Sequence, residues 1–300
     1  MQKALIIGNT GFLGRHFVAK AKSIMDLTNI NSKNCDLLTD KIYEYDNEKY
    51  DYIFYFAVKT EAGGYCQSHP GEQFLINQKM NTRVLDYWYT KQKQAKFITF
   101  GSSCSYSDDS IKKEENYLMG PCETGYESYG MIKRMLLVGL KSLASEYGMK
   151  YLFYVPSCLY GSQYDEGDKH FIYDINRKIC DAKFMNSPAP SLWGDGHQRR
   201  EMIYIEDAIE IIISFLDKEN EIINLSTGLD YSIREYAKNI CDIIDYDFNN
   251  ITFDLTKFVG AKEKKLVVEK IKNFDFIDPS VGLKSLVDFY TKNYMKGDLK

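Results

Sequence analysis

Short apolar runs alternate with amphipathic stretches through the first half of the chain. The runs contain few polar residues, as expected for strands buried on both faces, whereas the longer stretches repeat apolar residues at helical spacing. Strands are predicted at residues 3–8, 50–58, 96–100 and 151–157, and helices at 12–24, 74–92 and about 127–147. Strands that alternate with helices form a parallel sheet covered on both faces. We therefore predict an α/β fold built on a doubly wound parallel sheet.

The alternation of apolar runs and amphipathic stretches is less regular in the second half of the chain. The segment "NSPAPSLWGDG" at residues 186–196 is rich in proline and glycine and indicates an irregular connection. No internal repeat and no low-complexity linker separates the halves. We expect a larger lobe of residues 1–160 plus about 200–226, and a smaller mixed α/β lobe of about 161–199 and 227–300.

Composition and charge exclude several classes of protein. Of 300 residues, 44% are hydrophobic and 27% charged, and the formal net charge of -4 comes without a basic tract for a nucleic-acid backbone. No apolar stretch reaches the length of a membrane span, and no cleavage site precedes the first strand. We expect a cytoplasmic protein with no nucleic-acid or membrane partner. Seven scattered cysteines without a C-x-x-C pair predict free thiols and no metal site.

The motif "GNTGFLG" places Gly8, Gly11 and Gly14 where the first strand meets the first helix. Glycines there permit a sharp turn, and they also allow a dinucleotide pyrophosphate to approach the helix N-terminus. The G-x-x-G-x-x-G spacing resembles the extended, nucleotide-sugar-modifying branch of the short-chain dehydrogenase/reductase superfamily. That resemblance implies a Rossmann-type sheet in which the larger lobe binds the dinucleotide and the smaller lobe the nucleotide sugar. It assigns these residues to the cofactor: Gly8, Thr10, Gly11, Phe12, Leu13 and Gly14.

A further strand is expected between the first helix and residue 50, ending at about "LTNINSKN" (residues 27–34), and the residues there bear on the choice of cofactor. "LTNINSKN" has no acidic residue to bind an adenosine 2′-hydroxyl, which weighs against NAD(H), although NAD(H) stays possible. Ser32 and Lys33 can receive a 2′-phosphate, so NADP(H) is favoured. Asp36 and Leu37 follow in a stretch that resembles a family segment and are included among the expected cofactor contacts.

The motif "YGMIK" places Tyr129 and Lys133 four residues apart on the predicted helix. A cation beside a phenol favours the phenolate and lowers the tyrosine pKa toward working pH, although such a pair is also common on a solvated helix face. The pair begins 27 residues after Ser102, where the superfamily carries its Ser, Tyr and Lys triad. By that resemblance Ser102 binds the reacting oxygen, Tyr129 transfers the proton, and Lys133 also holds the nicotinamide ribose.

The segment "WGDGHQRREM" resembles the branch's G-x-G-x-Q-x-R-[DE]-[FM] pattern. The resemblance implies that Arg200 takes the nucleotide-sugar diphosphate, for which a guanidinium fork is well suited, and that Trp193 covers the base or sugar. Without this resemblance, the segment is also consistent with a turn followed by the solvated start of a helix. Lys264 lies near a phosphate-contacting lysine of the family's C-terminal segment.

Within the branch the chain resembles the GDP-fucose synthases, through "FGSSCSY", "NSKNCDLLTD", "FAVKTEAGG", "WGDGHQRRE" and "ITFDLTKFVGAKEKKL". That family uses a cysteine two residues after its catalytic serine, together with a histidine, to move protons beside a ketone. The corresponding residues are Cys104 and His170, and Ser103 joins Ser102 as a substrate contact. A thiol and an imidazole both titrate near enough to neutrality for such work. A buried cysteine that only fills the core and a structural histidine are the alternatives.

The resemblance implies an NADP-dependent enzyme and a homodimer. It would epimerise a GDP-4-keto sugar of 6-deoxymannose or heptose type at C3 and C5, and then reduce C4. The alternatives are a plain C4 reductase, a redox-neutral NAD-dependent 4-epimerase, and a non-catalytic nucleotide sensor on the same fold. A dehydratase is disfavoured, because the chain has "SSCSY" where that group has Thr-Asp-Glu.

Overall fold

The computed structural model describes residues 1–61, 64–257 and 263–295. Contacts between residues divide the chain into two units. The first unit is Met1–Pro156, Ala208–Leu225 and Val267–Lys272, and the second is Ser157–Asp207, Ser226–Leu266 and the chain from Asn273 onward. Residues 157–160, 200–207 and 267–272 thus fall in the opposite unit from the one expected from the sequence. Residues 158–160 and 200–204 belong to two strands that pair with each other in the second unit, which the sequence pattern does not show.

A six-stranded, wholly parallel sheet forms the centre of the first unit, in the order β2-β1-β3-β4-β5-β9. Its strands are β1 (Gln2–Ile7), β2 (Met25–Ile30), β3 (Tyr52–Tyr55), β4 (Lys96–Phe100), β5 (Tyr151–Pro156) and β9 (Glu221–Leu225). The predicted doubly wound sheet is confirmed. The strand order reverses between β1 and β3, and ligands of such sheets bind at the carboxyl edge beside this reversal.

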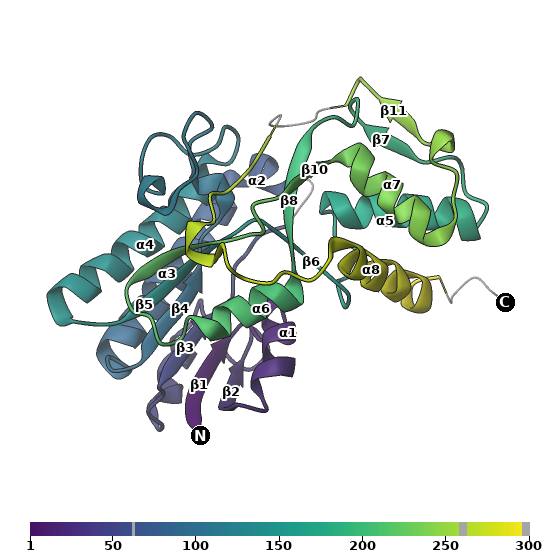
Figure 1. Ribbon diagram of the computed structural model, residues 1–300. Coiled ribbons are helices and arrows are strands. Elements are labelled where there is room, and N and C mark those ends of the chain that lie inside the picture. Colours follow the sequence, from purple (N-terminus) through teal and green to yellow (C-terminus); the bar gives the residue numbers. More distant parts are fainter. Residues whose placement is uncertain (62–63, 258–262, 296–300) are drawn as a thin grey trace. The chain divides into compact units, whose positions relative to one another are not determined.

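Helices cover both faces of this sheet: α1 (Phe12–Ala21), α3 (Pro70–Lys91), α4 (Glu127–Tyr147) and α6 (Ile205–Ser214). The short helix α2 (Tyr65–Ser68) directly precedes α3. Figure 1 shows α3 and α4 packed together on one side of the sheet, while an ion pair between Lys20 and Glu210 joins α1 to α6 on the other. The predicted helix over 127–147 is confirmed at both ends. Helix α3 begins four residues earlier than predicted, because Pro70 occupies the first helical position, where its missing N–H costs nothing. Short 3₁₀ turns lie at η1 (Asp40–Asp46), η2 (Ser103–Ser105), η3 (Glu114–Asn116) and η5 (Glu269–Ile271).

The second unit is a small mixed assembly. In its three-stranded sheet β8 (Arg199–Tyr204) lies between β6 (Cys158–Tyr160), which is parallel to it, and β10 (Asp230–Ser232), which is antiparallel. A separate parallel pair is formed by β7 (Ser191–Trp193) and β11 (Thr252–Asp254). The remaining elements are α5 (Phe171–Phe184), α7 (Ile233–Ile244), α8 (Pro279–Asn293) and the 3₁₀ turn η4 (Phe248–Asn250). Among all the described helices, none is both long and apolar enough to cross a bilayer.

Candidate active site

The glycine turn between β1 and α1 is shaped to receive a pyrophosphate. Gly8 has a φ of 94°, and a Cβ there would lie 2.7 Å from the backbone nitrogen of Ala57. A Cβ on Gly14 would lie 2.2 Å from the carbonyl oxygen of Gly8, so only glycine lets α1 approach the turn this closely. Gly11 caps α1 without a side chain, and the first turn of the helix has no acidic residue. The backbone N–H groups at this N-terminus therefore suit a phosphate, and the turn fits a dinucleotide.

The side chains of this turn and of the start of α1 are exposed or half-buried. Thr10 is exposed, and its carbonyl oxygen accepts a hydrogen bond from Arg15 Nη1 at 3.1 Å. Phe12 packs its ring 5.0 Å from that of His16, and Leu13 is half-buried. Arg15 thus ties the start of α1 back onto the turn.

The segment after β2 is organised by asparagine side chains. Asn31 Nδ2 donates to Asn9 Oδ1 at 3.0 Å and so joins this segment to the glycine turn. Asn31 Oδ1 accepts from the Lys33 N–H at 3.0 Å. Ser32 and Lys33 are exposed, and the residue directly after β2 is Asn31 rather than an acid. This arrangement leaves a hydroxyl and an ammonium group accessible at the strand end.

Asp36 and Leu37 play a more structural part. Asp36 Oδ1 accepts from the Leu38 N–H at 2.9 Å. Leu37 is buried, and its carbonyl oxygen accepts from Arg83 Nη1 of α3 at 3.0 Å. Together these bonds hold the chain that leaves the strand against α3.

The turn after β4 presents Ser102. Its Oγ accepts a hydrogen bond from the Cys104 N–H at 3.2 Å, which leaves the hydroxyl proton available to a substrate oxygen. The Ser102 N–H donates to the Tyr117 hydroxyl at 3.2 Å, and that hydroxyl donates to Ser105 Oγ at 2.8 Å. Tyr117 is fully buried, and its two hydrogen bonds hold this turn in place. The sequence analysis missed this residue, because its spacing from Ser102 matches no motif.

Helix α4 brings Tyr129 and Lys133 to the same turn. Ser105 Oγ donates to the carbonyl oxygen of Gly130 at 3.2 Å, which fixes the start of α4 against η2. Lys133 Nζ lies 5.8 Å from the centroid of the Tyr129 ring. Because β1 and β4 are parallel strands of one sheet, this group and the glycine turn lie at the same carboxyl edge.

The pKa shifts of Tyr129 and Lys133 differ from those expected from the sequence. Burial raises the pKa of the Tyr129 phenol and lowers that of the Lys133 ammonium to about 8. The expected lowering of the tyrosine pKa by its neighbour is therefore wrong for the resting side chains, because desolvation penalises both charged forms. Tyr129 rests as a neutral acid beside a lysine that is still protonated at neutral pH.

Arg134 of α4 is a second positioning residue that the sequence analysis missed. Its guanidinium donates to the carbonyl oxygens of Gly120 at 2.6 Å, Ser105 at 2.5 Å and Met119 at 2.8 Å. The side chain is buried, so these charge-assisted bonds tie η2 firmly to the helix that carries Tyr129.

Cys104 lies within η2, half-buried, and its carbonyl oxygen accepts from the Glu123 N–H at 3.1 Å. All seven cysteines are free, as predicted. Ser103 is also half-buried, and its carbonyl oxygen accepts from the Tyr106 N–H at 3.2 Å. Across the described part of the chain, His, Cys, Asp and Glu side chains form no group of three that would hold a metal ion.

His170 lies in the second unit, at the N-terminal cap of α5, and is exposed. Its Nδ1 lies 2.5 Å from Asp168 Oδ1, and the same oxygen accepts the His170 backbone N–H at 2.8 Å. A carboxylate on Nδ1 favours the tautomer that leaves Nε2 to take or give a proton. Asp168 therefore orients the imidazole. Its only sequence signal is a D-x-H spacing, which is too common to be informative.

Arg200 lies on β8 and is half-buried. Tyr236 donates to its carbonyl oxygen at 2.9 Å, and its own Nη1 donates to the carbonyl oxygen of Arg199 at 2.8 Å. Arg199 is held by Asp230, at 3.1 Å between Nε and Oδ2. Arg199 thus stabilises the strand pair, and Arg200, beside it on β8, is the residue that the resemblance assigns to the diphosphate.

Glu201 follows Arg200 and is almost completely buried. Its Oε2 accepts from the Leu266 N–H at 2.9 Å, which anchors the segment that carries Lys264, a half-buried residue. Burial raises the pKa of Glu201 to about 7, against the opposing effects of the hydrogen bond from Leu266 and the charge of Lys265. Trp193 ends β7 and is 55% exposed. In sum, Ser102, Cys104, Tyr129 and Lys133 come together in the first unit, whereas His170, Trp193, Arg200 and Lys264 belong to the second.

Comparison with known proteins gives a consistent picture. The family model described as "NAD dependent epimerase/dehydratase family" matches residues 4–226. The chain is 29% identical to the GDP-L-colitose synthase of Yersinia pseudotuberculosis, over 96% of this chain and 97% of that protein. Among solved structures it resembles a GDP-L-fucose synthetase from Naegleria fowleri, with a TM-score of 0.85, 23% identity and coverage of 98% and 94% of the two chains. It also resembles a GDP-mannoheptose C4 reductase from Campylobacter jejuni with NADP bound, with a TM-score of 0.82, 21% identity and coverage of 97% and 98%.

Proposed function

The chain belongs to the NAD dependent epimerase/dehydratase family, and on that premise we propose that it is an NADP-dependent enzyme acting on a GDP-4-keto sugar of 6-deoxymannose or heptose type. The reaction is epimerisation beside the ketone at C3, C5 or both, followed by reduction at C4. The observation that carries the proposal is the grouping of Ser102, Tyr129 and Lys133 at the carboxyl edge of the sheet, beside the glycine turn. The predicted membership of the extended short-chain dehydrogenase/reductase superfamily is confirmed by the family match.

Two observations support NADP(H) as the cofactor. Ser32 and Lys33 are exposed just after β2, where an NAD enzyme of this fold places an acid. The related reductase from Campylobacter jejuni carries NADP in its structure, and the relatives named as GDP-sugar synthases match nearly the whole chain. Gly8, Gly11 and Gly14 would hold the pyrophosphate, and bound NADPH would supply a hydride to C4 of the sugar.

The reduction needs an acid for the C4 oxygen. Ser102 donates its free hydroxyl proton to that oxygen in a hydrogen bond, and Tyr129 gives the oxygen the proton that completes the alcohol. Tyr129 becomes a phenolate in this step. Lys133, protonated below about pH 8, stabilises that phenolate, so proton transfer is easier than the resting tyrosine pKa suggests.

For the epimerisation we assign proton removal to Cys104 and reprotonation to His170, as the resemblance to the GDP-fucose synthases implies. The C4 ketone acidifies the hydrogens on C3 and C5. The Cys104 thiolate takes one of them to give an enolate, and the imidazolium of His170 returns a proton to the opposite face of that carbon. Asp168 on Nδ1 of His170 supports this role, because it leaves Nε2 for the substrate.

Deuterium exchange tests this assignment. In D₂O without NADPH, we expect the enzyme to wash deuterium into C3 or C5 of GDP-4-keto-6-deoxymannose, followed by NMR. Cys104→Ser should lose most of the exchange, because a hydroxyl is a far weaker base than a thiol with an ordinary pKa of about 8.5. Cys158→Ser is the matched control, since Cys158 is also a half-buried free thiol. Undiminished exchange in Cys104→Ser would remove the cysteine from the mechanism.

A plain C4 reductase is the second candidate. It is favoured by the likeness to the GDP-mannoheptose C4 reductase. The three residues of the reducing step, Ser102, Tyr129 and Lys133, also all lie in the first unit. In that case no exchange occurs with any accepted ketone, while NADPH-dependent reduction persists.

We also propose that the protein is a homodimer. Met131, Met135 and Val138 of α4 are exposed, and their spacing places them on one stripe of the helix. Three large apolar side chains along one exposed helix face favour association with a second copy.

A further inference from the structure

Two cysteines of the first unit meet at the start of α4. The Cys104 carbonyl oxygen accepts a hydrogen bond from the Glu123 N–H at 3.1 Å, and Cys122 directly precedes Glu123. A Cβ on Gly130 would lie 2.7 Å from Cys122 Sγ and 3.0 Å from that same carbonyl oxygen, so both cysteines contact α4 at this one glycine. Two segments joined in this way bring their Cα atoms near the roughly 4.4–6.8 Å that a disulfide spans.

The two thiols differ in how far they are open to solvent. Cys104 is half-buried, whereas Cys122 is 5% exposed. Burial raises the pKa of the Cys122 thiol, against the opposing charge of Arg134, so Cys122 stays a thiol at neutral pH. Peroxides attack an accessible thiolate, and a neighbouring thiol captures the sulfenic acid that forms. Cys104 therefore suits the first role, and Cys122 suits the second.

Cys66 of α2 is the other thiol that could capture an oxidised Cys104. Burial, the charge of Cys104 and the charge of Cys66, in that order, raise the pKa of the Tyr129 phenol, which places both thiols near that ring. The Cys66 Sγ, however, accepts a hydrogen bond from Gln73 Nε2 at 3.4 Å, and Gln73 is completely buried. This bond holds the Cys66 thiol against α3, so Cys122 is better placed.

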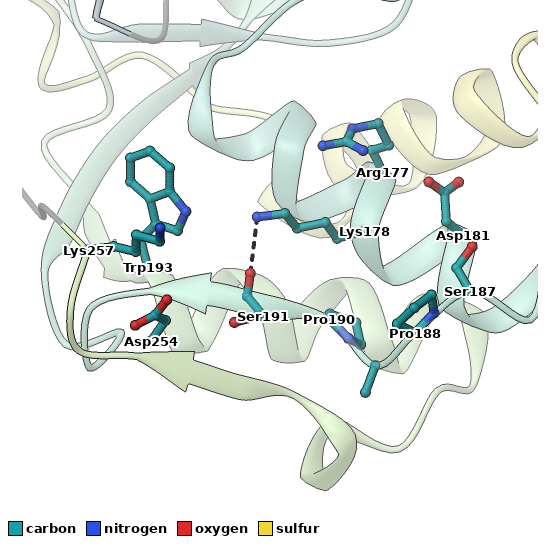
Figure 2. A pocket seen from close by; sticks show the side chains of 11 residues that line it. Arg177, Lys178, Asp181, Ser187, Pro188, Pro190, Ser191, Trp193, Asp254 and Lys257 are labelled. Atoms are coloured by element: carbon teal, nitrogen blue, oxygen red, sulfur yellow. Dashed lines mark hydrogen bonds between the residues drawn. The ribbon is translucent and has the colours of Figure 1, made fainter.

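A second pair of cysteines, in the second unit, is shielded from oxidants. Cys180 of α5 and Cys241 of α7 are completely buried, and burial raises the pKa of each thiol to about 12. A hollow of about 460 Å³ opens beside α5, and Figure 2 shows that this helix contributes Arg177, Lys178 and Asp181 to its wall. Among the described residues that line the hollow there is no cysteine. The hollow therefore gives a peroxide no thiolate to attack.

We propose that Cys104 and Cys122 are a redox-sensitive pair, and that the disulfide between them switches the active site off. Hydrogen peroxide oxidises the Cys104 thiolate to a sulfenic acid, and the peroxide O–O bond breaks with release of hydroxide. The Cys122 sulfur then attacks the Cys104 sulfur, which forms the S–S bond and releases water. In total, two thiols and one peroxide give one disulfide and two waters. A dithiol such as dithiothreitol reverses the change by thiol–disulfide exchange.

The disulfide acts on both steps of the reaction, and this consequence rests on the proposed function. It removes the Cys104 thiolate that takes the proton beside the ketone. It also displaces the turn that presents Ser102, because the Cys104 N–H donates to Ser102 Oγ at 3.2 Å. A displacement of a reacting group by about 1 Å costs up to about a hundredfold in rate. We therefore expect NADPH oxidation to fall at least about tenfold in the oxidised protein and to return with dithiothreitol.

Tryptic mapping of the full chain after peroxide treatment tests the pairing without any measurement of activity. Trypsin places the three cysteines on separate peptides: Cys66 on 60–79, Cys104 on 97–112 and Cys122 on 114–133. We expect a cross-link between the peptides of Cys104 and Cys122, which dithiothreitol removes. A cross-link from Cys104 to Cys66, or oxidation of Cys104 without any cross-link, overturns the proposal.

The Cys122→Ser variant removes the capturing thiol and leaves every residue assigned to catalysis in place. Before oxidation it should match the parent in turnover. After peroxide treatment its Cys104 should advance to the sulfinic acid, which dithiothreitol does not reduce, so its activity should not return. Cys66→Ser is the matched control, because it also replaces a buried thiol of the first unit, and it should recover as the parent does. Equal recovery of Cys122→Ser and the parent would contradict the assigned role of Cys122.

The outcomes separate this inference from the proposed function. If the cross-link forms while the oxidised parent reduces a GDP-4-keto sugar at the full rate, the inference alone is wrong. If the cross-link forms and reverses but the parent reduces no 4-keto sugar, the redox pair stands and the proposed reaction is wrong. If there is neither a cross-link nor reduction, both are wrong.

Discussion

Replacing Lys133 should change both the size and the pH dependence of the reduction. Lys133 is 8% exposed, and its burial lowers the ammonium pKa to about 8. Tyr129 has a raised pKa and remains a neutral acid across the working range. Of these two residues, Lys133 is therefore the one that titrates close to neutrality. We expect kcat/KM for reduction to be level below about pH 8 and to fall about tenfold per pH unit above it, as Lys133 loses its charge.

The magnitude follows from the distance between the two groups. With the ring centroid as the position of the phenolate charge, the ammonium lies 5.8 Å away. At an effective dielectric constant of about 20, two unit charges at this separation attract by about 3 kcal/mol. This attraction acts in the transition state, where the phenolate develops, and corresponds to roughly a hundredfold in rate. Lys133→Met should lose about this factor at pH 7 and show no decline above pH 8.

The assay is NADPH oxidation, followed at 0.5-unit steps from pH 6 to 10 with saturating cofactor and a ketone that needs no epimerisation. Lys133→Arg is the informative control, because a guanidinium keeps its charge over this range and should remove the decline above pH 8. A parent profile that stays level to pH 10, or a decline at pH 8 that persists in Lys133→Arg, would refute this reasoning.

Three further predictions concern other parts of the molecule. Lys33→Ala should lower kcat/KM with NADPH roughly tenfold and leave the value with NADH unchanged, since only NADPH carries the 2′-phosphate; an equal loss with both cofactors counts against this site. In urea unfolding, the free energy of unfolding of Glu201→Gln minus that of the parent should increase by about 2 to 3 kcal/mol as the pH rises from 5 to 8. The folded-state pKa of about 7 exceeds the ordinary value, so the parent loses stability as pH rises over this window; a constant difference would contradict the burial argument. Val138→Glu should give a monomer by light scattering, whereas Val281→Glu, an equally exposed valine on α8, should not change the mass.

Most strands of the parallel sheet in the first unit were predictable, because they are short apolar runs buried on both faces, as in β3 and β4. Strand β2 is an exception, since its sequence MDLTNI is mixed and only its first and last residues are buried. The helices between the strands carry a clear apolar periodicity. The second unit was less predictable. Its strands are mostly three residues long, as in β7 and β11, and such segments carry no periodicity to recognise. The pairing of β8 with β6 and β10 moved residues 200–207 out of the unit to which the sequence had assigned them.

The residues of the candidate site also differ in how well the sequence could predict them. Ser102, Tyr129 and Lys133 stand out because chemistry requires those residue types at that spacing. Tyr117 and Asp168, which orient the reacting groups, do not stand out, because a hydrogen bond to a backbone N–H or an imidazole can come from many positions. The sequence also could not predict the direction of the Tyr129 pKa shift. It depends on how deeply the fold buries the phenol, whereas the sequence shows only the neighbouring charge.

The central claim is that this chain reduces a GDP-4-keto sugar with NADPH through Tyr129. The direct measurement mixes the parent enzyme, NADPH and GDP-4-keto-6-deoxymannose, follows NADPH absorbance and identifies the product by NMR. The account predicts one NADPH consumed for each C4 alcohol formed, and a loss of at least about a hundredfold in Tyr129→Phe, with NADPH affinity unchanged. No NADPH consumption by the parent with this ketone or its heptose counterpart, or full turnover in Tyr129→Phe, would contradict it.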